Sequence, residues 1–263
     1  VSELAALHDQ GKEIAVVSSG AVAAGMTRLG RTERPQSIPE KQALAAVGQI
    51  RLMALYERAF AKFDKSIAQV LLTHEDLANR QRYLNAKHTF QMLLASSIIS
   101  IVNENDTVAV DEMKFGDNDH LSALVATLLE ADLLVILSDV EGVYDRDPRL
   151  NTDAVLIPLI QDIKEMKYQV IGSSRSVFGT GGMATKIGAA EEAAAAGAEQ
   201  VLIVSATADP PGAHEDHLLV RRRAQRARRR RRHRARHNPR RSGPRSRFSS
   251  SRATPGTTSS SEA

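Results

Sequence analysis

The sequence predicts an α/β fold: a three-layer α/β/α sandwich with a mainly parallel central sheet. Short runs of Val, Ile and Leu that do not alternate in polarity recur over the first 205 residues. Such runs are typical of strands that are buried on both faces. Longer segments with apolar residues at helical spacing separate them. This alternation favours parallel strands joined by right-handed crossovers, with helices on both faces of the sheet.

Each element has a local reason in the sequence. Gly11 ends the first helix, Gly20 follows the first strand, and a loop at 35–39 is bounded by prolines. Thr73, and Asp117 or Asn118, can cap the helices that follow them. The strands are expected, in order, at residues 13–18, 67–72, 98–102, 133–137 and 201–204. The helices are expected, in order, at residues 2–9, 21–29, 40–63, after Thr73, at 82–95, from 118, at 163–171 and at 183–196, with a short excursion at 108–113.

Two polar clusters follow the apolar run at 98–102. Residues 103–106 follow it directly, and residues 117–119 open the next helix. In open α/β sheets, ligands bind just outside the carboxyl ends of the strands. The amides and carboxylates of these clusters suit a small zwitterion or a metal–phosphate group. Asn and Asp also favour turns for local reasons, so either cluster alone is ambiguous, but the two together favour a binding site.

Three further features could belong to a binding site. Ser19 and Gly20 lie between a strand and a helix, where free N–H groups can bind an anion, although a simple Ser cap is the alternative. The polar loop 138–149 lies at the carboxyl end of the strand at 133–137, with Tyr144 as a possible platform for a ligand, and the alternative is a surface loop with turn residues. Residues 178–186 contain three glycines and end at Lys186, a pattern that can bind phosphate or serve as a hinge. The spacing matches neither the P-loop nor the dinucleotide fingerprint.

The composition separates the body from the tail. The chain has 263 residues and no Cys, which excludes disulfides and thiolate metal sites and fits a reducing compartment. No apolar run approaches the roughly 20 residues of a membrane span. Residues 215–263 hold 16 Arg, no Lys and three acids, whereas the preceding residues hold 19 basic and 28 acidic side chains. We therefore expect an acidic globular domain followed by a disordered basic tail.

Seven segments together resemble glutamate 5-kinases, a branch of the amino acid kinase family. The resemblance covers about residues 1–205, in order and without large gaps. The pair formed by Asn-Glu-Asn-Asp at 103–106 and Gly-Asp-Asn-Asp at 116–119 is specific to that branch, and the other pieces are shared more widely. The segments are residues 16–25, 41–49, 103–106, 116–119, 138–142, 147–149 and 179–186.

The resemblance implies transfer of the ATP γ-phosphoryl to the side-chain carboxylate of L-glutamate, the first step of proline biosynthesis. It implies that Ser19, Asp106 and Asn118 bind glutamate, with Asp106 facing the ammonium. It also implies that Asp119 and Lys186 are catalytic, with Asp119 orienting lysines and Lys186 facing the developing phosphoryl charge. The residues implied for ATP are Ser138, Asp139, Thr180, Gly181, Gly182, Met183, Ala184, Thr185 and Lys186. No protein metal ligand is expected, because Mg²⁺ would arrive with the nucleotide.

Two departures from the family lead to further expectations. Residue 1 is Val, and a first strand with a phosphate-facing Lys would precede it, so we expect an incomplete kinase domain over 1–205 and an inactive chain. From residue 206 we expect a disordered Arg/Ser/Pro-rich tail, most simply the product of a shifted reading frame. The resemblance also implies a cytoplasmic enzyme that is a homo-oligomer when complete.

Two other functions fit parts of the sequence. Another amino acid kinase would act on acetylglutamate, aspartate or a nucleoside monophosphate, although Asp106 argues against substrates without a free ammonium. A non-enzymatic protein could bind nucleic acid through the Arg-rich tail. Because interleaved aromatics and a docking fold are missing, no specific nucleic acid is expected.

Overall fold

The computed structural model describes residues 1–109, 118–146, 148, 150–161, 163, 182–205 and 217–222. These residues belong to one compact unit, Val1–Arg223. The strands are β1 (Lys12–Val17), β2 (Ile67–Leu72), β3 (Ile99–Glu104), β4 (Leu133–Ser138), β5 (Gln200–Ser205) and β6 (His217–Arg222). The helices are α1 (Ser2–Asp9), α2 (Ala21–Arg28), α3 (Ile38–Ala61), α4 (His74–Ala78), α5 (Arg80–Ala95), α6 (Asn118–Leu129) and α8 (Gly182–Ala195).

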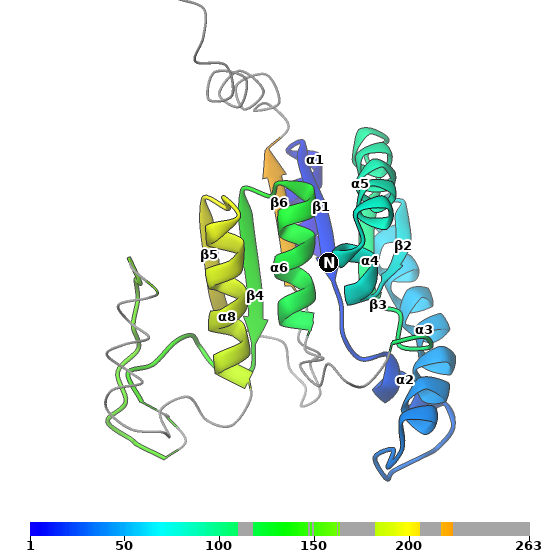
Figure 1. Ribbon diagram of the computed structural model, residues 1–263, viewed down its shortest axis with the longest axis horizontal. Helices are drawn as coiled ribbons and strands as arrows, with labels where there is room; N and C mark the ends of the chain where they lie inside the picture. The colour runs from blue at the N-terminus through cyan, green and yellow to red at the C-terminus, as the bar shows by residue number, and fades with distance from the viewer. Residues whose placement is uncertain are drawn as a thin grey trace, which may run out of the picture. The chain divides into compact units, whose positions relative to one another are not determined.

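The strands form one sheet in the order β2-β3-β1-β6-β4-β5 (Figure 1). β3 runs parallel to β2 and β1, and β4 runs parallel to β5. β6 is antiparallel to both of its neighbours, β1 and β4. The prediction of an α/β fold on a mainly parallel sheet is confirmed, and each of the five expected strands is present within two residues of its expected bounds.

The prediction of a wholly disordered tail from residue 206 is wrong for residues 217–222. They form β6, which pairs with β1 over its full length, from Lys12 opposite Arg222 to Val17 opposite His217. Leu219 and Val220 are only 1% and 8% exposed. The short apolar run at 218–220 was not recognised as a strand, because Arg dominates the composition of the whole tail. The rest of the tail lies outside the described residues, as does most of the expected helix at 163–171.

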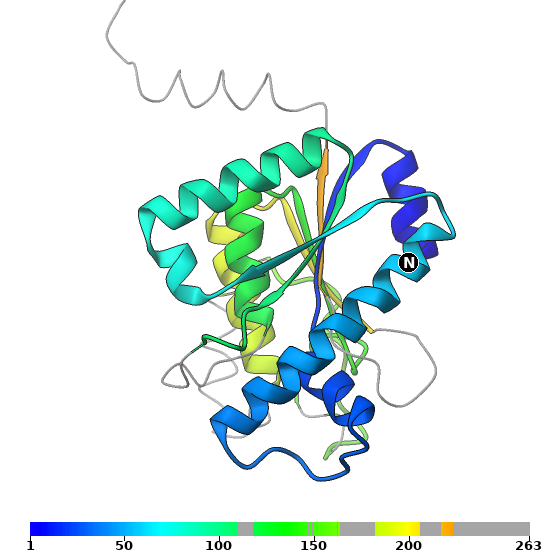
Figure 2. The ribbon, with the colours of Figure 1, turned by 90° about the vertical axis from the view of Figure 1, so that its right-hand side faces the viewer.

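Helices cover both faces of the sheet, as Figure 2 shows with the sheet seen from its edge. Side chains of β1 alternate between the two faces. Ile14 and Val16 pack in a core cluster with α1 and α3, whereas Ala15 and Val17 pack in the cluster that α5, α6 and α8 complete. The third helix begins at Ile38, earlier than expected, because a proline is well tolerated in the first turn of a helix.

Helix α2 crosses α3 at very close range. A Cβ atom added at Gly48 would lie 1.7 Å from the carbonyl oxygen of Ala21, and one added at Gly25 would lie 2.0 Å from that of Leu44. Only glycine permits this approach of the two backbones. The crossing holds the turn between β1 and α2 against α3, at the carboxyl end of the parallel strands (Figure 1).

Candidate active site

The turn after β1 forms the first wall of the site. Ser18 is fully buried, and its N–H donates to the carbonyl oxygen of Val102 in β3 at 2.8 Å. Gly20 follows with φ of 99°, a left-handed conformation that a residue with a Cβ adopts only with strain. The turn therefore presents Ser19 at the end of β1, next to the end of β3.

Asn118, the first residue of α6, connects three segments that are distant in sequence. Its Nδ2 donates to the carbonyl oxygen of Ser18 at 2.7 Å, to Ser19 Oγ at 2.8 Å and to Asn103 Oδ1 at 3.1 Å. Asn103 is 3% exposed, and its own Nδ2 donates to Gln49 Oε1 at 2.9 Å. The structure thus brings together two of the expected substrate residues, Ser19 and Asn118.

Asp106 lies in an adjoining groove between α3 and the segment after β3. The groove has a volume of about 530 Å³, and Gln49, Glu104 and Asn105 are among its lining residues. Burial raises the pKa of Asp106 above its ordinary value, and the charge of Lys41 offsets part of the rise. Burial and then the charge of Asp106 raise the pKa of Glu104. Gln49 links this groove to the hydrogen bonds of Asn118, because it lines the groove and accepts a hydrogen bond from Asn103, which in turn accepts one from Asn118.

A buried ion pair joins α6 to α8. Lys186 is 1% exposed and Asp119 is fully buried, with Nζ at 3.3 Å from Oδ1 and 3.4 Å from Oδ2. Thr185 Oγ1 donates to Asp119 Oδ2 at 2.6 Å. Such a pair is stable in a protein interior only when the two charges and their hydrogen bonds match. The two residues expected to be catalytic are therefore in direct contact.

Two of the expected ATP segments also converge. Ser138, at the end of β4, is 2% exposed and donates to Asp139 Oδ1 at 3.4 Å. Val143, further along the same loop, packs with Ile187 and Met183 of α8. Gly182 is the first residue of α8, so Ala184, Thr185 and Lys186 lie within its first turns. Thr180 and Gly181 lie outside the described residues.

Gln49 had no role among the expectations from the sequence, Asn103 was expected only as one of the amides of the polar cluster at 103–106, and Thr185 was expected to bind ATP alone. Asn103 belonged to a polar cluster that was recognised, but its partner Gln49 is 54 residues away in the chain. Thr185 stands next to Lys186, yet only the packing of α8 on α6 brings its hydroxyl to Asp119. Local patterns in the sequence do not show which of these distant residues meet.

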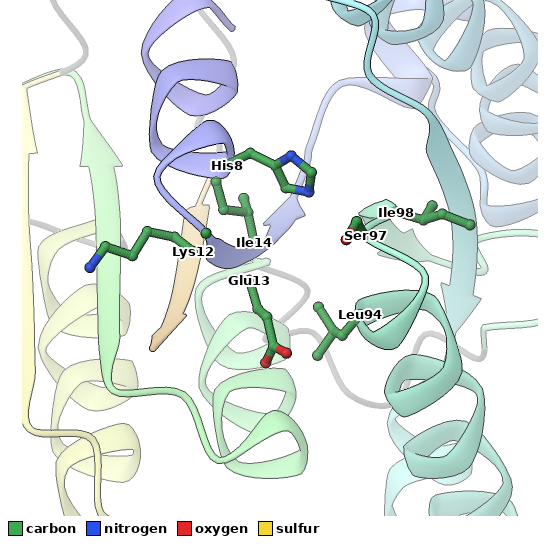
Figure 3. Close-up of a pocket in the computed structure, with 8 residues that line it drawn as sticks. His8, Lys12, Glu13, Ile14, Leu94, Ser97 and Ile98 are labelled. Atoms are coloured by element: carbon green, nitrogen blue, oxygen red, sulfur yellow. The ribbon is translucent and has the colours of Figure 1, made fainter. Parts of the chain in front are cut away.

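A second cavity lies at the opposite, amino end of β1 (Figure 3). Its volume is about 20 Å³, which is room for about one water molecule. Ile14, Leu94 and Ile98 contribute apolar side chains, and Lys12 points away from the other labelled residues. A cavity of this size has no room for a substrate.

None of the helices among the described residues is long and apolar enough to cross a membrane. Within the same residues, His, Asp and Glu side chains do not gather in groups of three or more that could hold a metal ion.

The sequence matches the family profile described as "Amino acid kinase family" over residues 1–205. The glutamate 5-kinase of Pelobacter propionicus is 56% identical over 191 residues, which are 73% of this chain and 51% of that protein. The glutamate 5-kinase of Geobacter metallireducens is 57% identical over 192 residues, 73% of this chain and 52% of that protein. The chain thus spans about half the length of these relatives. The crystal structure of T. acidophilum isopentenyl phosphate kinase in its product complex is similar over 72% of each chain, with a TM-score of 0.46 and 15% identity.

Proposed function

Because the chain belongs to the amino acid kinase family, we propose that the enzyme to which its kinase domain belongs phosphorylates the side-chain carboxylate of L-glutamate with ATP, giving L-glutamyl 5-phosphate for proline biosynthesis. The relatives that are 56% and 57% identical are named glutamate 5-kinases, which supports this substrate over others. The observation that carries the proposal is the neighbouring position of two groups on α6: Asn118, bonded to Ser19, and Asp119, paired with Lys186.

The proposed glutamate site consists of Ser19, Asp106 and Asn118. Asn118 already donates to Ser19 Oγ, so the two side chains have a fixed relative position without ligand. Asp106 supplies a carboxylate for the ammonium of the amino acid. Burial raises the pKa of Asp106, because it disfavours a lone negative charge, and a bound ammonium would remove that penalty. This pairing favours substrates with a free ammonium group.

The proposed phosphoryl site consists of Lys186, Asp119 and the start of α8. Free N–H groups at a helix N-terminus bind anions, and Lys186 lies about one turn inside the helix. We propose that Asp119 and Thr185 orient Lys186, whose ammonium stabilises the charge that develops during transfer. Ser138, Asp139 and Thr180 to Lys186 are the proposed ATP residues. A glutamate carboxylate is already ionised near neutral pH, so the reaction requires no general base.

Mg²⁺ would neutralise phosphate charge when it is bound with ATP. The chain's part of the reaction is positioning: it holds the glutamate carboxylate at Ser19 and Asn118 and the cation of Lys186 beside it. We propose that this reaction takes place in the cytoplasm and that the enzyme is a homo-oligomer, which light scattering would measure. The proposed kinase domain comprises residues 1–205 together with β6 of the same sheet. The absence of Cys supports a reducing compartment.

Hydroxamate formation tests the proposal. The chain is incubated with ATP, Mg²⁺, hydroxylamine and one of four acceptors: glutamate, acetylglutamate, aspartate or a nucleoside monophosphate, the last followed by ADP release. Since this chain by itself is expected to be inactive or nearly so, titration calorimetry measures its affinity for each acceptor beside the turnover assay, and we expect glutamate to be preferred. Turnover or binding of acetylglutamate without any of glutamate would overturn the assignment.

A further inference from the structure

Helix α3 carries three polar side chains at a spacing of seven residues: Gln42, Gln49 and Tyr56. Seven residues make almost two turns of an α-helix, so these side chains share one side of α3. We call them the polar stripe of α3. All three are partly buried, although the surrounding positions Leu44, Ala45, Leu52 and Phe60 are apolar and buried.

Each member of the polar stripe bonds to a different segment of the proposed glutamate site. Tyr56 OH donates to Ser18 Oγ at 2.9 Å, next to Ser19. Gln49 Oε1 accepts from Asn103 Nδ2 at 2.9 Å. Gln42 Nε2 donates to the carbonyl oxygen of Ala109 at 3.1 Å, in the segment that follows Asp106. The three contacts therefore hold the segments that carry Ser19 and Asp106, and they reach Asn118 through Asn103.

The contact of Gln49 helps to fix which way the amide of Asn103 faces, together with the N–H of Glu104, which donates to Asn103 Oδ1 at 2.9 Å. An amide has one oxygen that accepts and one NH₂ group that donates. Because Asn103 Nδ2 donates to Gln49, its Oδ1 faces the Nδ2 of Asn118 and accepts from it at 3.1 Å. In the opposite orientation, the NH₂ group of Asn103 would face the NH₂ group of Asn118, and two donors would meet. Gln49 thus holds the Nδ2 side of Asn103 while Glu104 N–H holds its Oδ1 side, and both keep the acceptor toward Asn118.

Packing alone does not account for a glutamine at position 49. Its Nε2 is buried and has no hydrogen-bond partner among the described residues. A buried donor without a partner is unfavourable, and an apolar side chain such as Met would avoid it. The favourable interaction of the Gln49 amide is therefore the hydrogen bond that its Oε1 accepts from Asn103 Nδ2.

We propose that the polar stripe of α3 positions the substrate-binding residues, and that Gln49 is its central member, acting on Asn118 through Asn103. The inference rests on the proposed function for its substrate, L-glutamate. Gln49 is a positioning residue in this scheme, because its effect on the substrate passes through Asn103 and Asn118.

Titration calorimetry with the full chain tests the inference. We expect Gln49→Met to weaken L-glutamate binding about threefold to tenfold, the loss of one hydrogen bond, while ATP binding stays within twofold. Gln81→Met is the matched control, since Gln81 is an exposed glutamine on α5 that bonds to Asn85. This control should leave both affinities unchanged. Equal weakening of glutamate and ATP by Gln49→Met would indicate a merely structural role and overturn the inference.

A double-mutant cycle separates action through Asn103 from other effects. In an Asn103→Ala chain, Gln49→Met should change glutamate affinity by less than twofold. A further threefold to tenfold loss in that background would contradict the proposed route. Tyr56→Phe removes one hydroxyl and little volume, so it is the variant to use should Gln49→Met fail to fold. We expect it to weaken glutamate binding by about the same factor, and an unchanged affinity would count against the stripe.

A ligand-free measurement distinguishes failure of this inference from failure of the proposed function. The side-chain NH₂ signals of Asn118 in a ¹⁵N-correlated NMR spectrum report its hydrogen bonds to Ser18, Ser19 and Asn103. They should shift in Gln49→Met and stay in place in Gln81→Met. Unchanged Asn118 signals in Gln49→Met would overturn the inference. A shift in a chain that binds no glutamate would support the positioning and refute the substrate instead.

Discussion

Replacement of Lys186 by Met tests the buried ion pair most directly. Both partners are almost inaccessible, with Lys186 at 1% and Asp119 at 0% exposure, and Nζ lies 3.3 and 3.4 Å from the two carboxylate oxygens. Removing one partner strands a charge in a low-dielectric interior. This typically costs about 3–5 kcal/mol of stability. For a unit of this size, the melting temperature should fall by about 6–20 °C.

Urea and thermal unfolding, followed by circular dichroism, measure the loss. Lys87→Met is the matched control, because Lys87 pairs with Glu130 at 2.9 Å but at 25% and 50% exposure. A pair so open to water is worth at most about 1 kcal/mol. The double variant Asp119→Leu/Lys186→Met should recover most of the stability, since it strands no charge.

The two lysine variants therefore rank the two pairs. Equal losses in Lys186→Met and Lys87→Met would refute the reasoning, because they would mean that burial adds nothing to the Asp119 pair. A double variant as unstable as Lys186→Met would show that the side-chain volume, and not the charge, was responsible. Recovered stability without recovered ATP binding would support the proposed role of Lys186 in the phosphoryl site.

Three further predictions follow from single positions. Gly48→Ala should lose about 3 kcal/mol in urea unfolding, because its Cβ would lie 1.7 Å from Ala21 O, whereas Gly188→Ala on α8, with nothing within 4 Å, should gain about 0.5–1 kcal/mol. Asp106→Asn should weaken glutamate binding and leave ATP binding unchanged. Burial raises the pKa of Asp106 in the folded chain. The contribution of this carboxyl to folding stability is therefore complete below its ordinary pKa of 3.8 and is lost as the pH rises through its folded-state pKa. The variant should accordingly be more stable than the unaltered chain at pH 7 and depend less on pH over that window; equal stability would contradict this. Thr73→Ala should lose about 1 kcal/mol, because it removes both hydroxyl contacts of the capping box with Asp76, and thermal melting should detect the change.

Local patterns in the sequence were sufficient for most of the fold. The runs at 98–102 and 133–137 could be recognised as buried strands because a strand covered on both faces needs apolar residues at every position. The polar cluster after the first run could be placed at the edge of the sheet, because parallel strands end together there. The same local patterns did not predict the strand β6. Its place between β1 and β4 depends on the free edges of those two strands, which are far away in sequence.

The sequence by itself determined the strands and helices, the family and the identities of Ser19, Asp106, Asn118 and Lys186 as candidate residues. Only the tertiary structure decided which of them touch. Asn118 and Ser19 are 99 residues apart, and Lys186 and Asp119 are 67 residues apart. Polar side chains that are so far apart meet because strand order and helix packing bring the ends of their elements together. Hydrogen bonds act only at about 3 Å, whereas sequence patterns record the local backbone and its burial.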